Sequence, residues 1–396
     1  MKTLTSFLHS EVAQDASREP FIQAIEAIAG AIPEDIIYVR TGGTEGLFKE
    51  RYFADGRLSI PEPVRLLTSG KSNSLAASME ILSFLRRNGL RGEILHGSPE
   101  YIAERILHPG QEISGDSLIA SVHPGRILEG ERLGVVGKPS DWLISSDVDH
   151  SKAKEVLGLE LIDIPMEELL EEIAKHSHPA VELPALNEPK YGKPIPESDL
   201  SDALDIYGAL RRIIDRYFLN GLTIRCFDLL TSVHNTGCMA LALLNSEGFA
   251  ATCEGDVPAM VSMALARKLT GCSGFQANLS QIKGDDLLFA HCTVPLSMTR
   301  SWVYDTHFES GFGVAVHGEI PEGPVTIFKL SPDFDRAFIF EGEMVANDYQ
   351  ENLCRTQIHV NAPGAAPYFL SSSIGNHHII IPGHVAGALR EILCVE

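Results

Sequence analysis

The order in which apolar segments follow one another constrains the fold of this chain more than any other feature. Up to residue 176, short apolar runs that end in glycine turns alternate with amphipathic stretches, as in PVRLLTSGKSNSLAASMEILSFLRRNG. Such alternation predicts repeated strand–helix units, which assemble as parallel sheets covered by helices. Beyond residue 221 the apolar runs follow one another mostly without helices between them, which favours antiparallel strands. We therefore expect an α/β protein with two Rossmann-like parallel-sheet units, followed by a C-terminal α+β domain built as an antiparallel barrel or sandwich.

The length of the chain predicts several compact parts, because 396 residues are too many for one ordinary core. Residues 179–199 hold five prolines among small and polar residues, a composition typical of a linker. The stretch that follows, 199–218, has the periodicity of a helix. We expect a Rossmann-like domain over 1–128, a second α/β unit with the linker and the helix over 129–220, and a C-terminal domain with the reaction centre over 221–396.

Charge and composition limit the kinds of partner. A formal net charge of −21 repels phosphate backbones and anionic lipids, so we expect neither nucleic acid nor a membrane surface as a partner. A small neutral solute or a metal cation fits better. The amino terminus lacks the apolar region of a secretion signal, and no apolar run approaches the roughly 20 residues that span a bilayer, so we expect a cytoplasmic protein. The seven cysteines form no CxxC pair, which favours reduced thiols over a disulfide framework or a zinc ribbon.

Two carboxylates stand at the end of an apolar run in GFAATCEGDVPAM. Asp256 precedes Val257 and Pro258, which is the pattern of a helix N-cap, so its structural role competes with a catalytic one. Glu254 has no such structural explanation. A carboxylate at the end of a buried strand needs a cation, a hydrogen-bond donor or a ligand, and we therefore expect Glu254 to be functional.

Histidines gather in the last third of the chain. His291, in LLFAHCTVP, has apolar neighbours and is either a core histidine or a ligand, whereas His307 lies in the turn YDTHFESGFG, where side chains reach ligands. In the tandem pair His377 and His378, one ring can face a cavity while the other faces away. Together with Glu254 these residues predict a site for a divalent cation with oxygen and nitrogen ligands, such as Mn²⁺.

Two glycine turns in the first third, TGGTEG and SGKSNS, follow predicted strands, where open α/β sheets bind ligands. Neither is a Walker loop or a GxGxxG fingerprint. Their residues Glu45 and Asn73 are candidates for substrate contacts, and the reading of both as ordinary turn residues stays open.

Several segments, in this order, resemble the C-terminal half of the L-fucose isomerase family and, more distantly, L-arabinose isomerase. They are CEGDVPAM, LTGCSGFQAN, LLFAHCTVP, THFESGFGVAVHG and GNHHIIIPGHV. The earlier GGTE, KSNSLAASMEIL and GKPSDWLISS resemble the amino-terminal part of fucose-isomerase-like proteins. The resemblance implies an aldose–ketose isomerase that binds Mn²⁺ and passes a proton between C1 and C2 of an open-chain sugar through an enediol.

Carried over by position, the resemblance implies that Glu254 and His377 are metal ligands and that Glu254 is also catalytic. The second acidic ligand of fucose isomerases is replaced here by Asn278, which can bind a metal through its carbonyl oxygen but cannot carry a proton. Arabinose isomerase has a glutamate ligand where this chain has His291, and a histidine ligand that His307 resembles. Either His291 or Asp256 is then the second acid or base, or the substrate has changed to an acidic or sulfonated sugar.

The resemblance also implies a homo-oligomer, a trimer or a hexamer, in which the amino-terminal turns of one chain close the pocket of another. We expect the sugar to contact Glu45, Asn73 and His378. Two other functions remain open: a non-catalytic sugar-binding or regulatory relative, and a lyase or epimerase that uses the same enediolate.

Overall fold

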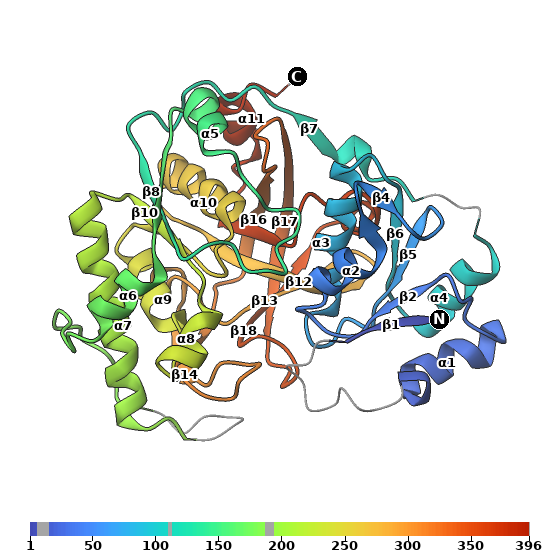
Figure 1. Ribbon diagram of the computed structural model, residues 1–396, viewed down its shortest axis with the longest axis horizontal. Helices are drawn as coiled ribbons and strands as arrows, with labels where there is room; N and C mark the ends of the chain where they lie inside the picture. The colour runs from blue at the N-terminus through green and yellow to red at the C-terminus, as the bar shows by residue number, and fades with distance from the viewer. Residues whose placement is uncertain (6–15, 110–112, 187–193, 396) are drawn as a thin grey trace.

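The computed structural model describes residues 1–5, 16–109, 113–186 and 194–395. Two parallel sheets lie on either side of an antiparallel barrel: the sheet of the first 110 residues is on the right in Figure 1, the second sheet is on the left, and the barrel is between them. The predicted mixed α/β class and the antiparallel barrel are confirmed. The Rossmann-like character of the two parallel units stays a prediction.

The first sheet is wholly parallel, with helices on both faces. Its strands, in spatial order, are β1 (Lys2–Leu4), β2 (Ile37–Val39), β5 (Val64–Leu67) and β6 (Gly92–Leu95). Tyr38 and Leu67 pack toward α1 (Pro20–Ala29) and α4 (Pro99–Leu107). On the other face, Ile37 and Leu66 pack toward α2 (Glu45–Tyr52) and α3 (Ser74–Arg87). A short hairpin, β3 (Phe53–Ala54) and β4 (Arg57–Leu58), follows α2, and the 3₁₀ turn η2 (Ala16–Arg18) precedes α1.

The second sheet is also parallel and takes strands from both sides of the boundary expected at residue 221. In spatial order they are β11 (Ala250–Thr252), β10 (Gly221–Ile224), β8 (Arg132–Val136) and β9 (Glu160–Ile164). The helices of this part are α5 (His150–Leu157), α6 (Met166–Ile173), α7 (Glu197–Tyr217), α8 (Phe227–Ser232), α9 (Cys238–Ser246) and α10 (Val257–Thr270). The first two strands after residue 221 therefore extend a parallel sheet, and antiparallel pairing begins only at β12.

Six antiparallel strands close on themselves to form the barrel. Around the barrel they are β16 (Gly323–Leu330), β19 (His377–Pro382), β12 (Phe275–Lys283), β13 (Asp286–His291), β18 (Thr356–Asn361) and β17 (Arg336–Asp348). Strand β7 (Ile119–Ser121) pairs with the first three residues of β17, and β14 (Ser301–Asp305) pairs with β15 (Ala315–Glu319). The remaining short elements are η3 (Asp116–Leu118), η4 (Leu296–Met298), η5 (Tyr368–Ser372) and α11 (Ala386–Ile392).

Two helices join the parallel sheets to the barrel and fix the place of the candidate site. Helix α3 lies between the first sheet and β12, and its side chains from Ser74 to Leu85 are buried. Helix α10 lies between β10 and β11 on one side and the barrel strands β16 and β19 on the other. The starts of both helices therefore face the barrel.

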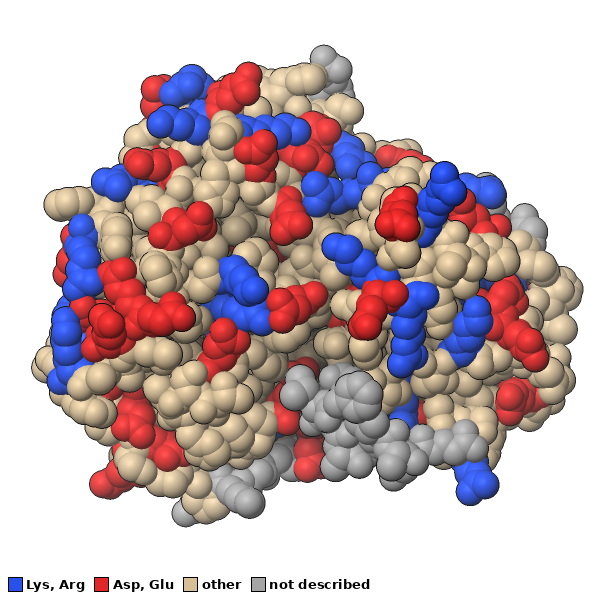
Figure 2. Space-filling view, in the orientation of Figure 1, with Lys and Arg blue, Asp and Glu red and all other residues tan. Residues whose placement is uncertain are grey.

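One local prediction from the sequence differs from the structure, and another can be compared with the structure only in part. The run LTIRCFDLL is one of the apolar runs from residue 221 onward that favoured strands, but β10 ends at Ile224 and α8 begins at Phe227. In the proline-rich linker, 179–186 and 194–196 have neither helix nor strand, and 187–193 lie outside the described residues. Among the helices that the structure describes, none combines the length and the apolar character needed to cross a bilayer. Acidic and basic side chains are intermixed over the face in Figure 2.

Candidate functional site

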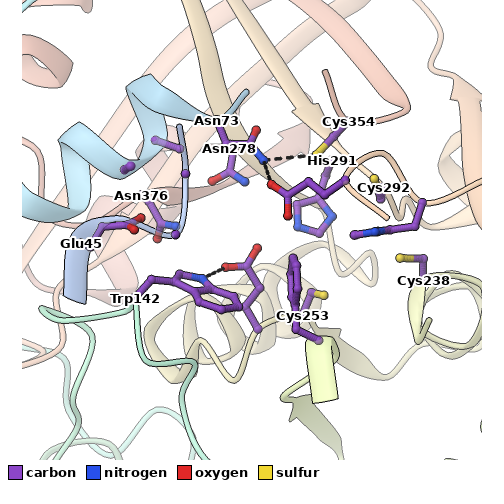
Figure 3. Close-up of a pocket in the computed structure, with 18 residues that line it drawn as sticks. Glu45, Asn73, Trp142, Cys238, Cys253, Asn278, His291, Cys292, Cys354 and Asn376 are labelled. Carbon is purple, nitrogen blue, oxygen red and sulfur yellow. Dashed lines mark hydrogen bonds between the residues drawn. The ribbon is translucent and has the colours of Figure 1, made fainter. Parts of the chain in front are cut away.

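A cavity lies where the starts of α3 and α10 face the barrel, and all three parts of the chain contribute to its wall (Figure 3). Its histidine, carboxylate and amide side chains are Glu45, Asn73, Glu254, Asn278, His291, His307, Glu309 and Asn376. Trp142 and Phe227 add an aromatic surface, with their ring centroids 4.8 Å apart. The amino-terminal turns thus line a cavity of their own chain, whereas the family resemblance implied that they close a partner's pocket.

Glu254 stands in the bend between β11 and α10, where its φ is +67°, a left-handed conformation that non-glycine residues seldom adopt. The next residue, Gly255, also has a positive φ, and a Cβ there would lie 2.6 Å from the carbonyl oxygen of Lys138. This close approach brings the loop of Trp142 to the site. The indole Nε1 of Trp142 donates a 2.6 Å hydrogen bond to Oε2 of Glu254.

Three donor side chains converge beside the cavity. Glu254 and His291 from its wall and the fully buried His377 each offer one atom, and these atoms lie within 4.8 Å of one another. Nε2 of His377 is buried and 3.4 Å from Oε1 of Glu254, and it has no hydrogen-bond partner among the described residues. A buried nitrogen without a partner beside a carboxylate is a position that a cation can satisfy. Two imidazoles and one carboxylate suit divalent transition metals, so the residues present fit such an ion.

Asp256 supports this group from behind and lies outside the cavity wall. It caps α10 by accepting a 2.7 Å hydrogen bond from the amide of Ala259, and its Oδ2 is 2.9 Å from Nδ1 of His377. The buried ammonium of Lys329 lies 3.5 Å from the same oxygen. Burial opposes ionisation of Asp256, but Lys329 and His377 outweigh burial and hold the pKa of Asp256 well below its usual range. An ionised Asp256 therefore directs Nε2 of His377 toward Glu254.

The charges around His377 and Glu254 stabilise each other. Burial by itself lowers the pKa of His377, but the charge of Glu254 and the hydrogen bond to Asp256 raise it to about 9. Burial likewise raises the pKa of Glu254, but His377 and Trp142 overcome this effect and lower it. At neutral pH the imidazole of His377 therefore carries a proton and a positive charge beside Glu254, and a bound cation would take the place of that proton.

His291 and His307 are neutral at pH 7, because burial lowers the pKa of His291 to about 3 and that of His307 to about 4. His291 belongs to the converging group. His307 also lines the cavity, but its Nδ1 is 3.1 Å from Oγ of Ser310 and its ring packs edge-on against Phe227, so it stands outside the group of three.

A carboxylate that the sequence did not single out, Glu309, reaches the cavity from the turn after β14. Its Oε1 accepts a 2.9 Å hydrogen bond from Nδ2 of Asn73. Burial, followed by the negative charge of Glu254, raises the pKa of Glu309 to about 7. Glu309 is therefore a side chain in the cavity that can gain and lose a proton near neutral pH. The only signal in the sequence was the glycine- and carboxylate-rich turn that surrounds His307.

Several oxygen atoms of the cavity wall lack a donor among the described residues. They are Oδ1 of Asn73, Asn278 and Asn376, and Oε2 of Glu45. Asn278 is the direct cross-strand neighbour of His377, so it stands beside the converging donors. Burial raises the pKa of Glu45 well above its usual range, with Glu80 and Glu254 adding to the effect. Such acceptors match a ligand that carries many hydroxyl groups.

His378 lies away from the cavity, packed against the rings of Phe338, Tyr368 and Phe369. Its Nε2 is 2.9 Å from the hydroxyl of Tyr368 and its Nδ1 is 3.1 Å from the carbonyl oxygen of Asn376. Successive side chains of a strand point to opposite faces, which separates His378 from His377. Burial lowers the pKa of His378 to about 3, so its ring is neutral.

The chain is similar to sulfoquinovose isomerases. It is 22% identical over 371 residues to those of Priestia aryabhattai and Priestia megaterium, which covers 87% of this chain and 82% of each relative. The sulfoquinovose isomerase of a Clostridium species (strain MSTE9) is 27% identical over 222 residues, 48% of this chain and 47% of the relative. No protein-family model matches the chain.

Proposed function

We propose that this chain is a divalent-metal-dependent aldose–ketose isomerase that acts on a sugar through an enediol. The observation that carries the proposal is the convergence of Glu254, His291 and the buried Nε2 of His377 beside a cavity in which four wall oxygens lack donors among the described residues. The similarity over most of the chain to proteins named sulfoquinovose isomerase supports the same reaction class.

Glu254, His291 and His377 would hold the cation, and Asn278 and His307 are candidates for further ligands from the cavity wall. We infer Mn²⁺ or another divalent transition metal from this donor set. When bound, the ion supplies Lewis-acid polarisation of two adjacent sugar oxygens. Asp256 holds His377 in place and is a positioning residue rather than a proton carrier, because it lies behind the ring.

Isomerisation requires a group that removes the proton from C2 and returns it to C1. Asn278 cannot do this, and the neutral, buried His291 is better suited to bind a cation. We infer that Glu309 carries the proton, since it lines the cavity and its hydrogen bond to Asn73 orients one oxygen. Glu254, in contact with His377 and Trp142, then acts as ligand and as the partner carboxylate for the hydroxyl proton.

The substrate that we propose is a sulfonated aldose, on the strength of the relatives' name. Glu45, Asn73 and Asn376 would accept hydrogen bonds from its hydroxyl groups. We further propose a cytoplasmic homo-oligomer, a trimer or a hexamer. Light scattering coupled to size exclusion measures the subunit number, and a single chain in solution would contradict the oligomer.

Proton NMR in deuterated water tests the reaction directly. The wild-type protein with Mn²⁺ is incubated with sulfoquinovose, and in parallel with glucose as the neutral counterpart. We expect exchange at C2 and a new ketose with sulfoquinovose, no exchange with Glu254→Gln or Glu309→Gln, and intact metal binding in Glu309→Gln alone. Tight sugar binding without exchange would instead identify a binding or regulatory relative, which the amide at Asn278 makes the second candidate. Products other than a ketose would identify a lyase or an epimerase.

A further inference from the structure

Four thiols in the cavity wall have no part in the proposed reaction: those of Cys238, Cys253, Cys292 and Cys354. Figure 3 shows Cys292 and Cys354 on the same side of the cavity as His291 and Asn73. Both side chains are almost completely buried by the protein, so the cavity is their contact with small solutes. Their number and position call for an explanation, because a wall of alanines would pack equally well beside a metal site.

Strand geometry brings Cys292 and Cys354 together. Cys292 follows the last residue of β13, and Cys354 stands two residues before the first residue of β18. Because His291 is paired with Thr356 across these neighbouring strands, Cys292 and Cys354 lie close together at the end of the barrel. Cys292 and Cys354 belong to the same small buried cluster, together with Cys238, Ala290 and Ala315. Cys253 also has a cysteine neighbour, Cys226, but Cys226 lies outside the cavity wall.

We propose that Cys292 and Cys354 form a modification site, a dithiol that hydrogen peroxide entering the cavity converts reversibly into a disulfide, with weakening of the neighbouring metal site. One sulfur attacks a peroxide oxygen, the O–O bond breaks, and a sulfenic acid and one water form. The second thiol then attacks this sulfur, the S–O bond breaks, and the disulfide and a second water form. The two thiols lose two electrons and two protons, and the peroxide is reduced to two molecules of water.

Disulfide formation brings the two sulfurs within bonding distance. Sγ of Cys354 is 3.9 Å from Nδ2 of Asn73, the same amide that holds Glu309, so its displacement disturbs that carboxylate. Cys292 is the residue after His291 in the chain. Movement of its backbone therefore shifts His291, which is one of the three converging donors. The inference uses the proposed metal site but is independent of any sugar reaction, so the two proposals can fail separately.

The test uses the full chain with its two most accessible cysteines replaced, Cys272→Ser and Cys394→Ser, because these react first with any oxidant. Hydrogen peroxide is added in stoichiometric amounts, remaining thiols are alkylated, and disulfides are mapped by peptide mass spectrometry. Mn²⁺ affinity is measured by calorimetry before oxidation, after it, and after reduction with dithiothreitol. We expect one disulfide between Cys292 and Cys354 and a reversible weakening of Mn²⁺ binding by about tenfold or more.

Two variants in the same background serve as controls. Cys354→Ser should bind Mn²⁺ as tightly after peroxide as before it, whereas Cys238→Ser, which removes another thiol of the same wall, should behave like the parent. The proposal is overturned if Cys292 and Cys354 both remain open to alkylation, or if the disulfide joins Cys226 and Cys253 instead. A disulfide between Cys292 and Cys354 that leaves Mn²⁺ affinity unchanged would also overturn it.

Discussion

The two carboxylate oxygens of Glu254 are committed to different partners. Oε2 accepts the indole hydrogen bond of Trp142, and Oε1 faces Nε2 of His377. The left-handed backbone of Glu254 costs about 1–3 kcal/mol, and such strain persists only where surrounding contacts impose it. The arrangement fixes one oxygen and presents the other to the converging histidines.

Replacing Trp142 with phenylalanine should loosen the metal site. The ring remains, but the carboxylate of Glu254 loses its donor and can rotate away from His377. We expect Mn²⁺ affinity to fall by about tenfold, the usual effect of losing a contact that orients a ligand. Calorimetric titration measures this, with Trp302→Phe as control, since Trp302 packs against Tyr304 in β14. Equal affinities in the two variants would show that the indole hydrogen bond is dispensable.

Glu309 should set the pH dependence of proton exchange. A base must be ionised, so exchange at C2 should increase as pH rises through the pKa of Glu309, about 7 without a cation. A bound cation lowers this pKa, which places the inflection at or below pH 7. Rates of C2 exchange between pH 5 and 9 give the profile. Glu309→Gln should abolish exchange at every pH while retaining Mn²⁺ affinity, and an unchanged profile in that variant would exclude Glu309 as the base.

At the level of elements, the bend between β11 and α10 depends on a glycine. Gly255→Ala would place a Cβ 2.6 Å from a backbone oxygen of Lys138 and displace the loop of Trp142. Gly248 is a matched control, because it also has a positive φ but a Cβ there meets nothing within 4 Å. We expect Gly248→Ala to cost about 1 kcal/mol of unfolding free energy, and Gly255→Ala clearly more. Urea denaturation measures both, and equal losses would contradict the close approach.

The local sequence pattern predicted most helices and strands, but it did not predict which strands pair with one another. Helices α3, α7 and α10 follow from periodicity and from the N-cap at Asp256. The run that forms β11 would look the same in a parallel or an antiparallel sheet, so its pairing beside β10 could not be read from local sequence. Local sequence also did not predict that β16 and β17 pair to close the barrel, or that α8 begins soon after β10.

The residues of the candidate site could also be predicted only in part, because local sequence does not show which distant residues come together. Glu254 and His291 became candidates as polar residues at the end of apolar runs, and His377 as one of a tandem pair that precedes such a run and matches a histidine of the similar family. Trp142 and Glu309 were missed as functional residues, because their partners Glu254 and Asn73 lie 112 and 236 residues away in the sequence. His378 was predicted in the site because the tandem pair alone does not say which ring faces the cavity.

Across the whole molecule, buried neutral histidines should make stability sensitive to acid. Burial lowers the pKa of His96 to about 4 and that of His378 to about 3, from an ordinary value of 6.5. Below pH 6.5 these two histidines bind protons in the unfolded chain but stay neutral in the folded chain. Their contribution to stability is therefore complete above pH 6.5 and is lost as pH falls toward 4 for His96 and 3 for His378.

The melting temperature should therefore fall steadily between pH 6.5 and 4. His96→Gln keeps an acceptor for the amide of Ile282, which lies 3.1 Å from Nε2 of His96, and removes the titrating group. We expect a shallower decline for this variant by scanning calorimetry. Parallel curves for the variant and the wild type would show that His96 does not contribute.

The hydrogen bond between Trp142 and Glu254 makes the fluorescence of Trp142 sensitive to what binds at the site. The chain holds only two tryptophans, so a Trp302→Phe variant emits from Trp142 alone. A carboxylate in contact with the indole nitrogen shifts and quenches its emission, and any ion that draws the charge of Glu254 toward itself changes that effect. Fluorescence of a single side chain thus follows occupancy of the site in real time, without a label and without a substrate.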